Sequence, residues 1–193
     1  MATQLASGAA VPSRRVRAVN GRQVNVPAKR GRAHLQFRRF AGCPICHVLL
    51  CSFADRYVEV VGTGITVVVL FDSPDAELRG YWSVLPFPVV ADPDWVLYRD
   101  FGVDTGLRAI ADPREWWTGI RGGTAALLHR HDPDYVAVGS ADGTTHWGLP
   151  ADFLVDPDGT VVAAHYGHNA DDQWSVDRLL EVHRLHRGAA PPP

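Results

Sequence analysis

The hydrophobic pattern of this chain is a series of short apolar segments that alternate with helix-like ones. Residues 65–71 form a β-branched apolar run, which is typical of a buried parallel strand. Residues 34–40 and 88–91 predict two further strands. Two helix starts combine a capping residue with a proline, at Ser73-Pro74 and Asp92-Pro93. Helices are expected over residues 44–61, 75–85, 94–103, 112–130 and 175–186.

Two hairpins frame these alternating segments. Residues 16–26 place Asn20-Gly21 between two alternating strands, which is the strongest short-range hairpin signal. Near the other end of the chain, residues 151–155 and 160–166 flank a turn, and a single helix follows them. A hairpin followed by one closing helix matches the second half of the thioredoxin fold.

The order of these elements predicts the fold class and the domain boundaries. We expect an α/β, thioredoxin-like fold with a central mixed sheet flanked by helices, an N-terminal β-hairpin and an insertion around residues 112–146. Residues 13–187 are expected to form a single domain. Residues 1–12 and 188–193 are expected to be disordered tails.

Composition limits the class of protein. With 46% hydrophobic and 21% charged residues, a chain of 193 residues suits one globular core and excludes disordered, collagen-like and disulfide-scaffold proteins. No apolar stretch approaches the roughly 20 residues that cross a bilayer, and the first residues do not resemble a secretory signal. We therefore expect a cytoplasmic protein with no membrane partner. Three cysteines in such a protein suggest redox catalysis or metal binding before structural disulfides.

Positive charge is concentrated in the first part of the chain. Residues 1–54 hold nine basic side chains and no acidic one, although the formal net charge of the whole chain is -2. The arginines are scattered through strand-like sequence without a recognisable binding module, so we expect no nucleic-acid partner. All three cysteines lie in this segment, where positive charge favours the thiolate over the thiol.

Cys43 and Cys46, in a Cys-Pro-Ile-Cys segment, are the sharpest chemical feature of the sequence. The segment follows a strand and opens a helix, where unpaired N–H groups and the helix dipole lower the pKa of a cysteine. Pro44 is tolerated in the first helical turn, and Arg39 can add to the positive field. Half of a zinc site and a pair of inert buried thiols are the alternatives. Cys51 lies on another side of the helix, and we expect it to be a small buried hydrophobe.

Three segments of the sequence resemble the bacterial peroxiredoxin-like branch of the AhpC/TSA family, within the thioredoxin superfamily. They are LQFRRFAGCPIC at residues 35–46, GLPADFLVDPDGTVVAAHYG at 148–167 and DDQWSVDRLL at 171–180. The resemblance covers about residues 12–186. It implies a thioredoxin-like fold and thiol-dependent redox chemistry, with peroxide reduction as one form of it.

The sequence departs from the typical peroxiredoxin signature, P-x-x-x-T-x-x-C. With Cys46 as the final cysteine, Cys43 stands at the threonine and Arg39 at the proline. Pro150 stands where the later R-x-x-F-x-I-D strand of those enzymes supplies an arginine. Pro150 also stands where thioredoxin-like proteins keep a cis-proline facing the CxxC, and a trans proline at a strand start is the alternative. Trp147, three residues earlier, is expected near the active cleft as a substrate-binding residue.

These features together predict a thiol oxidoreductase, with a peroxiredoxin-like peroxidase as one form. Cys43 would attack a peroxide or disulfide substrate and Cys46 would resolve the intermediate, although the peroxiredoxin register leaves the reverse order open. Pro44, Arg39 and Pro150 would support the site, with no metal and no other cofactor. A thioredoxin-like protein or a low-molecular-weight thiol would act as the cellular reductant. The sequence leaves a homodimer open.

Two other functions fit the same sequence. The chain could be a non-catalytic thioredoxin-fold module that binds a partner or a metal, because the peroxiredoxin threonine and arginine are missing. It could also be a specialised pathway enzyme that acts on one small-molecule thiol or disulfide, with the insertion shaping its pocket. The histidine clusters lack the spacing that metalloenzymes use, and His129 and His131 are interpreted as surface groups.

Overall fold

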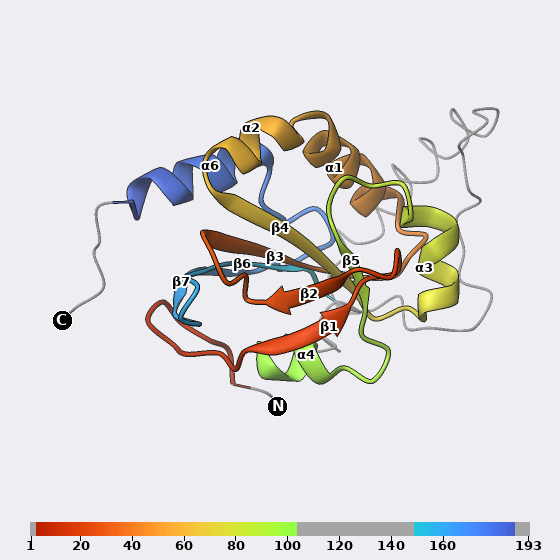
Figure 1. Cartoon of the computed structure of the whole chain (residues 1–193), viewed down its shortest axis with the longest axis horizontal. Coiled ribbons are helices and arrows are strands. Elements are labelled where there is room, and N and C mark those ends of the chain that lie inside the picture. Colours follow the sequence, from red (N-terminus) through yellow and green to blue (C-terminus); the bar gives the residue numbers. More distant parts are fainter. Residues whose placement is uncertain (1–2, 104–148, 188–193) are drawn as a thin grey trace.

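The computed structural model describes residues 3–103 and 149–187 and is built around one five-stranded sheet (Figure 1). Its strands are β3 (Arg32–Arg38), β4 (Ile65–Phe71), β5 (Val89–Ala91), β6 (Ala151–Val155) and β7 (Val161–Tyr166). Their order is β5-β4-β3-β6-β7; β3, β4 and β5 are parallel, whereas β6 and β7 are antiparallel to their neighbours. The predicted mixed sheet and α/β class are confirmed.

The predicted N-terminal hairpin is also confirmed. β1 (Arg14–Arg17) pairs antiparallel with β2 (Gln23–Val26) as a separate two-stranded sheet. Gly21, in the turn between them, has a φ of 86°, which glycine adopts without strain.

Helices lie on both faces of the central sheet (Figure 1). α1 (Pro44–Asp55), α2 (Tyr57–Gly62) and α6 (Val176–Leu185) cover one face, and α4 (Val96–Asp100) lies with the hairpin on the other. α3 (Asp75–Trp82) follows β4 and joins the core of the α1 face. Alternate residues of each central strand therefore enter two different cores. The α1-face core includes Leu50, Phe53, Val69, Leu154 and Leu179, and the other includes Leu35, Phe37, Tyr98, Phe101 and Phe153.

Two helix predictions need correction. The single helix expected over residues 44–61 is interrupted at Arg56, whose φ of -104° and ψ of 17° are not helical, although the apolar spacing continues across the break. Ser73 does not cap α3, because its hydroxyl accepts a hydrogen bond from the loop before α1. The Asp92 carboxylate does cap α4, since it accepts from the backbone N–H groups of Val96 and Leu97 at 3.0 and 2.7 Å.

Residues 3–12 do not form the disordered tail that their small side chains suggested. The segment runs antiparallel to β7, the outer strand of the sheet, and Gly8 and Val11 donate backbone hydrogen bonds to Val161 and Gly159 at 2.8 and 2.9 Å. An outer strand has unpaired N–H and C=O groups, and this segment pairs with them. Small residues permit the close approach: a Cβ on Gly159 would lie 2.6 Å from the Val11 carbonyl oxygen.

Some predictions lie outside the described residues. These include the helix over residues 112–130, the insertion at 112–146 and the C-terminal tail from residue 188. Within residues 3–103 and 149–187, no helix is both long enough and apolar enough to span a bilayer.

Candidate active site

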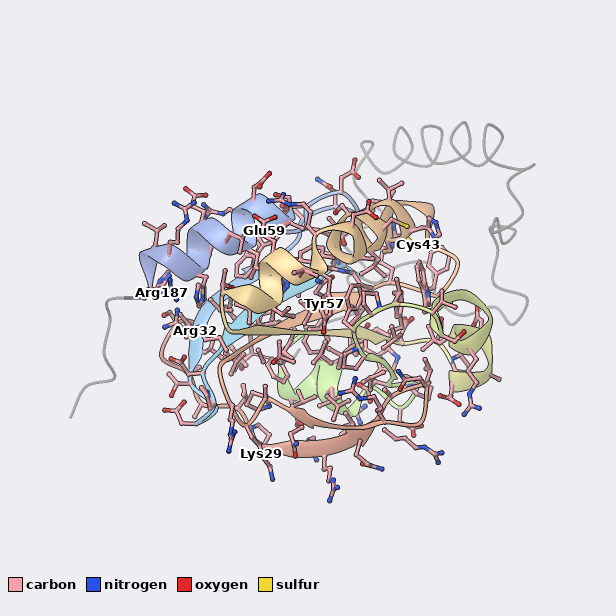
Figure 2. All side chains as sticks on the ribbon, turned by 45° about the horizontal axis from the view of Figure 1, so that its top comes forward. Lys29, Arg32, Cys43, Tyr57, Glu59 and Arg187 are labelled. Atoms are coloured by element: carbon pink, nitrogen blue, oxygen red, sulfur yellow. The ribbon has the colours of Figure 1, made fainter. Side chains whose placement is uncertain are left out.

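The two cysteines lie where the chain leaves β3 and enters α1. Figure 2 shows Cys43 at the start of α1. Cys43 is the N-cap residue of that helix, and its sulfur accepts a hydrogen bond from the Cys46 backbone N–H at 3.5 Å. Pro44 is the first residue of α1, where a missing N–H donor leaves no helical hydrogen bond unmade. The sequence therefore places a cysteine sulfur among the free N–H groups of a helix start, as its pattern predicts.

Both cysteines are free thiols, and both are buried. Cys43 is 2% exposed and Cys46 is fully buried, in a small cluster with Phe40 and Ile45. A hydrogen bond from the Cys46 thiol is the main cause that lowers the pKa of Cys43 to about 7, with further contributions from backbone N–H groups and the charge of Arg39. The same thiol–thiol contact, together with burial, raises the pKa of Cys46. Cys43 is therefore the more acidic thiol of the pair.

Arg39 is the charged side chain that acts on Cys43. It directly follows β3, and its guanidinium carbon lies 6.0 Å from the centre of the Phe40 ring. Its neighbour Arg38 is fully buried on the α1 side, and its charge acts on Cys46. This division agrees with the strand alternation of adjacent residues.

The end of β3 and the loop that carries Cys43 are held by three buried side chains from other elements. The Ser73 hydroxyl accepts from the Ala41 backbone N–H at 3.0 Å, and the Trp82 indole donates to the Ala41 carbonyl at 3.1 Å. The Tyr98 hydroxyl lies 2.5 Å from the Arg38 carbonyl oxygen. These contacts give the loop a fixed conformation before α1 begins.

Pro150 does not follow a cis peptide bond, which corrects the expectation. Among the described residues the cis bond precedes Pro27, and the Leu149–Pro150 bond is trans. The Pro150 carbonyl accepts from the Gly167 backbone N–H at 2.8 Å, so the residue extends the pairing of β6 with β7 as a strand-start proline would. The pairing of Ala151 with Phe37 still brings this end of β6 beside the end of β3.

Other predicted residues are placed differently or lie outside the described part. Trp147, His129 and His131 belong to the residues that are not described. Cys51 is half-buried on α1, and burial raises its pKa, which agrees with a packing role more than with a reactive one. Within residues 3–103 and 149–187, no group of three or more His, Cys, Asp or Glu side chains is arranged to hold a metal ion.

A buried polar network beneath α1 is the feature that the sequence interpretation missed. His34, Gln36 and Arg38 alternate along β3 and all face the α1 side, and Asp152 lies opposite Gln36 on β6. None of the four is more than 1% exposed. The signal was available in the sequence: a central strand covered on both faces should be apolar throughout, and residues 32–38 alternate instead.

The comparisons with known proteins agree with this geometry. The model of the AhpC/TSA family matches residues 7–164, which is most of the chain. No curated protein matches the chain significantly. Solved structures show the same fold at low sequence identity, as follows.

The peroxidoxin BcpB from Mycobacterium tuberculosis has 16% identity and a TM-score of 0.64, covering 97% of this chain and 100% of its own. A peroxiredoxin-like protein from Aquifex aeolicus has 14% identity and a TM-score of 0.61, covering 95% and 89%. A putative thiol:disulfide interchange protein DsbE from Chlorobium tepidum has 17% identity and a TM-score of 0.57, covering 93% and 99%. With a mixed sheet, a Cys-x-x-Cys at the start of α1 and a family match over residues 7–164, the chain belongs to the AhpC/TSA family of the thioredoxin superfamily.

Proposed function

We propose that this protein is a thiol-dependent reductase that cycles Cys43 and Cys46 between dithiol and disulfide. The observation that carries the proposal is the pair of contacts from Cys46 to the Cys43 sulfur, one from its backbone N–H at 3.5 Å and one from its thiol. They hold the pKa of Cys43 at about 7, so that a large share of the sulfur is thiolate at neutral pH. The resolving thiol is already in contact with the sulfur that it would attack.

A hydroperoxide is the first candidate substrate. The Cys43 thiolate would attack the terminal peroxide oxygen and break the O–O bond, so that the sulfur becomes a sulfenic acid and the departing alkoxide or hydroxide takes a proton from solvent and leaves as an alcohol or water. The Cys46 thiol would then displace the hydroxyl from Cys43, forming the S–S bond and releasing water. One thioredoxin-like dithiol, or two molecules of a low-molecular-weight thiol, would return the disulfide to the dithiol and be oxidised to a disulfide in turn.

The burial of Cys43 favours a small oxidant. At 2% exposure Cys43 is less accessible than a protein disulfide partner would require without movement of the surrounding loop. Arg39 is the cation available to support the thiolate in a chain that lacks the peroxiredoxin threonine. Pro44 would contribute by starting α1 at the right residue, Pro150 by setting the start of β6, and Trp147 by contacting the substrate. A cytoplasmic location remains part of this proposal.

Disulfide reduction is the second candidate. The Cys-Pro-Ile-Cys segment at a helix start is the dithiol arrangement of thiol–disulfide exchange, and one of the similar structures is a putative thiol:disulfide interchange protein. The two candidates share the same pair of cysteines and differ in the first bond that breaks, O–O or S–S.

Rapid mixing followed by mass spectrometry tests the proposal. Reduced protein is mixed with hydrogen peroxide, an organic hydroperoxide or a small disulfide, and the remaining thiols are alkylated at fixed times. Cys46→Ser should accumulate a sulfenic acid or mixed disulfide on Cys43, and Cys43→Ser should lose the fast phase. Cys51→Ala serves as the matched control and should react like the unaltered protein. Full turnover by both Cys43→Ser and Cys46→Ser would refute the cycle, and trapping on Cys46 alone would reverse the roles.

A further inference from the structure

The inward face of β3 carries an unbroken polar row under α1. His34, Gln36 and Arg38 all face the α1 side, where most of the other buried side chains are apolar. His34 lies between two aromatic rings, with its centroid 5.4 Å from that of Phe53 and 5.8 Å from that of Trp174. A polar row of this kind is expensive to bury unless every member is paired.

The network is paired almost completely through Asp152. Its Oδ1 accepts from His34 Nε2 at 3.0 Å and from Arg38 Nη2 at 2.8 Å, and its Oδ2 accepts from the Trp174 backbone N–H at 3.1 Å. Gln36 links the remaining groups, because its amide nitrogen lies 3.3 Å from His34 Nδ1 and its oxygen accepts from Arg38 Nη2 at 2.7 Å. A side-chain amide nitrogen only donates, so His34 is the neutral form with its proton on Nε2.

Charge is thereby fixed in two buried groups. Burial by itself would raise the pKa of Asp152, but the Arg38 charge and the His34 hydrogen bond outweigh it and hold that pKa well below its usual value. Burial lowers the pKa of His34. Asp152 is an anion, Arg38 is a cation and His34 is neutral. A buried ion pair of this sort is rarely more stabilising than packed apolar side chains, so its presence at this place calls for another role.

The position of Arg38 suggests that role. Arg38 is the last residue of β3, and the chain reaches the fully buried Cys46 through the loop that follows. Its positive charge lowers the pKa of Cys46 against the larger effects of Cys43 and burial, whereas Arg39 is the arginine that acts on Cys43. One donor of Arg38, Nε–H, is buried without a hydrogen-bond partner among the described residues. Arg38 faces the α1 side of the sheet, and Cys46 is fully buried in the first turn of α1, so the charge and the unpaired donor lie on the same covered face as Cys46.

We propose that Arg38, held in place by Asp152, Gln36 and His34, is a positioning residue for the resolving step, stabilising the thiolate form of Cys46. The inference rests on the proposed dithiol cycle and deepens it. In this step Cys46 gives up its proton, its sulfur attacks the Cys43 sulfur, and the bond from Cys43 to its leaving group breaks. The leaving group takes up the proton, so that a hydroxyl leaves as water. Arg38 neither gains nor loses a proton in this step.

The test separates the two steps with a probe that needs no natural substrate. In a Cys51→Ala background, reduced protein reacts with 2,2′-dithiodipyridine, which is uncharged and releases a coloured thiopyridone at each step. The first release reports the attack of Cys43, and the second reports the displacement by Cys46. The decisive variant is Arg38→Met with Asp152→Asn, which removes both charges together and so leaves no unpaired ion in the core.

The expected result is a selective effect on the second phase. Without the cation, the pKa of Cys46 rises and its thiolate fraction falls. A thiolate of higher pKa is a better nucleophile, which compensates in part. We therefore expect the rate of the second phase to fall about three- to tenfold. The first phase should change less than twofold. Arg38→Lys, which keeps the charge, should restore the second phase to within twofold. Arg32→Met with Asp156→Asn is the matched control, since it removes an arginine–aspartate pair 2.9 Å apart that involves the first residue of β3.

Every other outcome overturns either the role of Arg38 or the dithiol cycle itself. Equal rates of the second phase in the parent protein and in the Arg38→Met, Asp152→Asn variant would refute the inference. So would a second phase that is slowed by the same factor in Arg38→Lys or in the Arg32→Met, Asp156→Asn control. Slowing of the first phase by the same factor would show a general disturbance of the site. A parent protein with no second phase would refute the dithiol cycle itself, and is recognised because only one thiopyridone is released.

Discussion

At the scale of single residues, the site depends on which charge reaches which sulfur. The charge of Arg39 lowers the pKa of Cys43 and the charge of Arg38 lowers the pKa of Cys46, although the two arginines are adjacent in the sequence and the Arg39 backbone N–H also acts on Cys46. The reason is the alternation of a strand, which sends neighbouring side chains to opposite sides. Single substitutions should therefore separate the two chemical steps.

Arg39→Gln should make Cys43 react more slowly at low pH. The pKa of Cys43 is about 7, so its alkylation rate should fall about tenfold for each pH unit below that value. Loss of the Arg39 charge raises this pKa, and at pH 6.5 we expect a rate about two- to fivefold lower. Iodoacetamide labelling followed by peptide mass spectrometry measures Cys43 alone. Arg178→Gln, on the exposed side of α6, is the control; an identical pH profile for all three proteins would contradict the prediction.

Ser73→Ala should weaken the fold through the loop that carries Cys43. The Ser73 hydroxyl accepts from the buried Ala41 N–H at 3.0 Å, and its removal leaves that donor unpaired. We expect the free energy of unfolding to fall by about 1–3 kcal/mol in urea denaturation. Ser83→Ala, at an exposed position after α3, should change it by less than about 0.5 kcal/mol. Equal losses in the two variants would mean that the Ala41 N–H finds another partner.

At the scale of secondary-structure elements, the N-terminal segment behaves as part of the sheet. Residues 8–11 pair with the end of β7, which would otherwise be an open edge of the sheet. An exposed edge strand promotes association between molecules. By covering the edge strand β7, residues 8–11 therefore limit self-association as well as stabilise the fold.

Removal of residues 1–12 should lower stability and cause self-association. The truncated chain loses the backbone bonds between Ala9 or Gly8 and Val161, each 2.8 Å long, and uncovers β7. Sedimentation velocity at several concentrations should show larger species than for the full chain, and urea denaturation should show a lower midpoint. Removal of residues 1–4 keeps the pairing and is the control. A truncated chain that sediments like the full one would contradict the role of this segment.

Much of the element order could be predicted from local patterns. Asn20-Gly21 predicts the first hairpin, and the apolar run at residues 65–71 matches β4 residue for residue. Two of the errors have a common cause, because each depends on a contact with a distant part of the chain. The Ser73 hydroxyl accepts a hydrogen bond from Ala41 and does not cap its own helix. The Pro150 carbonyl accepts a hydrogen bond from Gly167, and the peptide bond before Pro150 is trans.

At the scale of the whole molecule, the reduced state should gain stability as the pH rises through neutrality. The pKa of Cys43 is lowered in the folded protein, so between about pH 7 and the ordinary thiol range the unfolded chain binds more protons than the folded one. Stability then increases with pH. The raised pKa of Cys46 acts in the opposite direction, but only at and above the ordinary thiol range.

Urea denaturation of the reduced protein and of Cys43→Ser measures this effect. From pH 6 to pH 8.5 the unfolding free energy of the unaltered protein should rise relative to that of Cys43→Ser by on the order of 2 kcal/mol. Parallel pH profiles for the two proteins would show that Cys43 is an ordinary thiol in the folded state. Reducing conditions throughout keep the disulfide from forming.

The location of the CxxC could be predicted, but its surroundings could not. A strand, a glycine and a Cys-Pro-Ile-Cys at a helix start form one continuous stretch of sequence. The buried network joins His34 and Arg38 to Asp152, which lies 114 residues after Arg38 along the chain. Only the antiparallel pairing of β6 with β3 brings them together, and local sequence does not specify that register.

The polar row on β3 has a consequence for protein design. A procedure that optimised only the stability of this backbone would place apolar side chains at positions 34, 36, 38 and 152, because packed apolar cores usually match or exceed buried ion pairs. The redesigned chain would fold around the same Cys43 at the same helix start. It would keep the Cys43 thiol but lack the buried cation that we propose acts on Cys46, because sequence optimisation for stability does not select for that role.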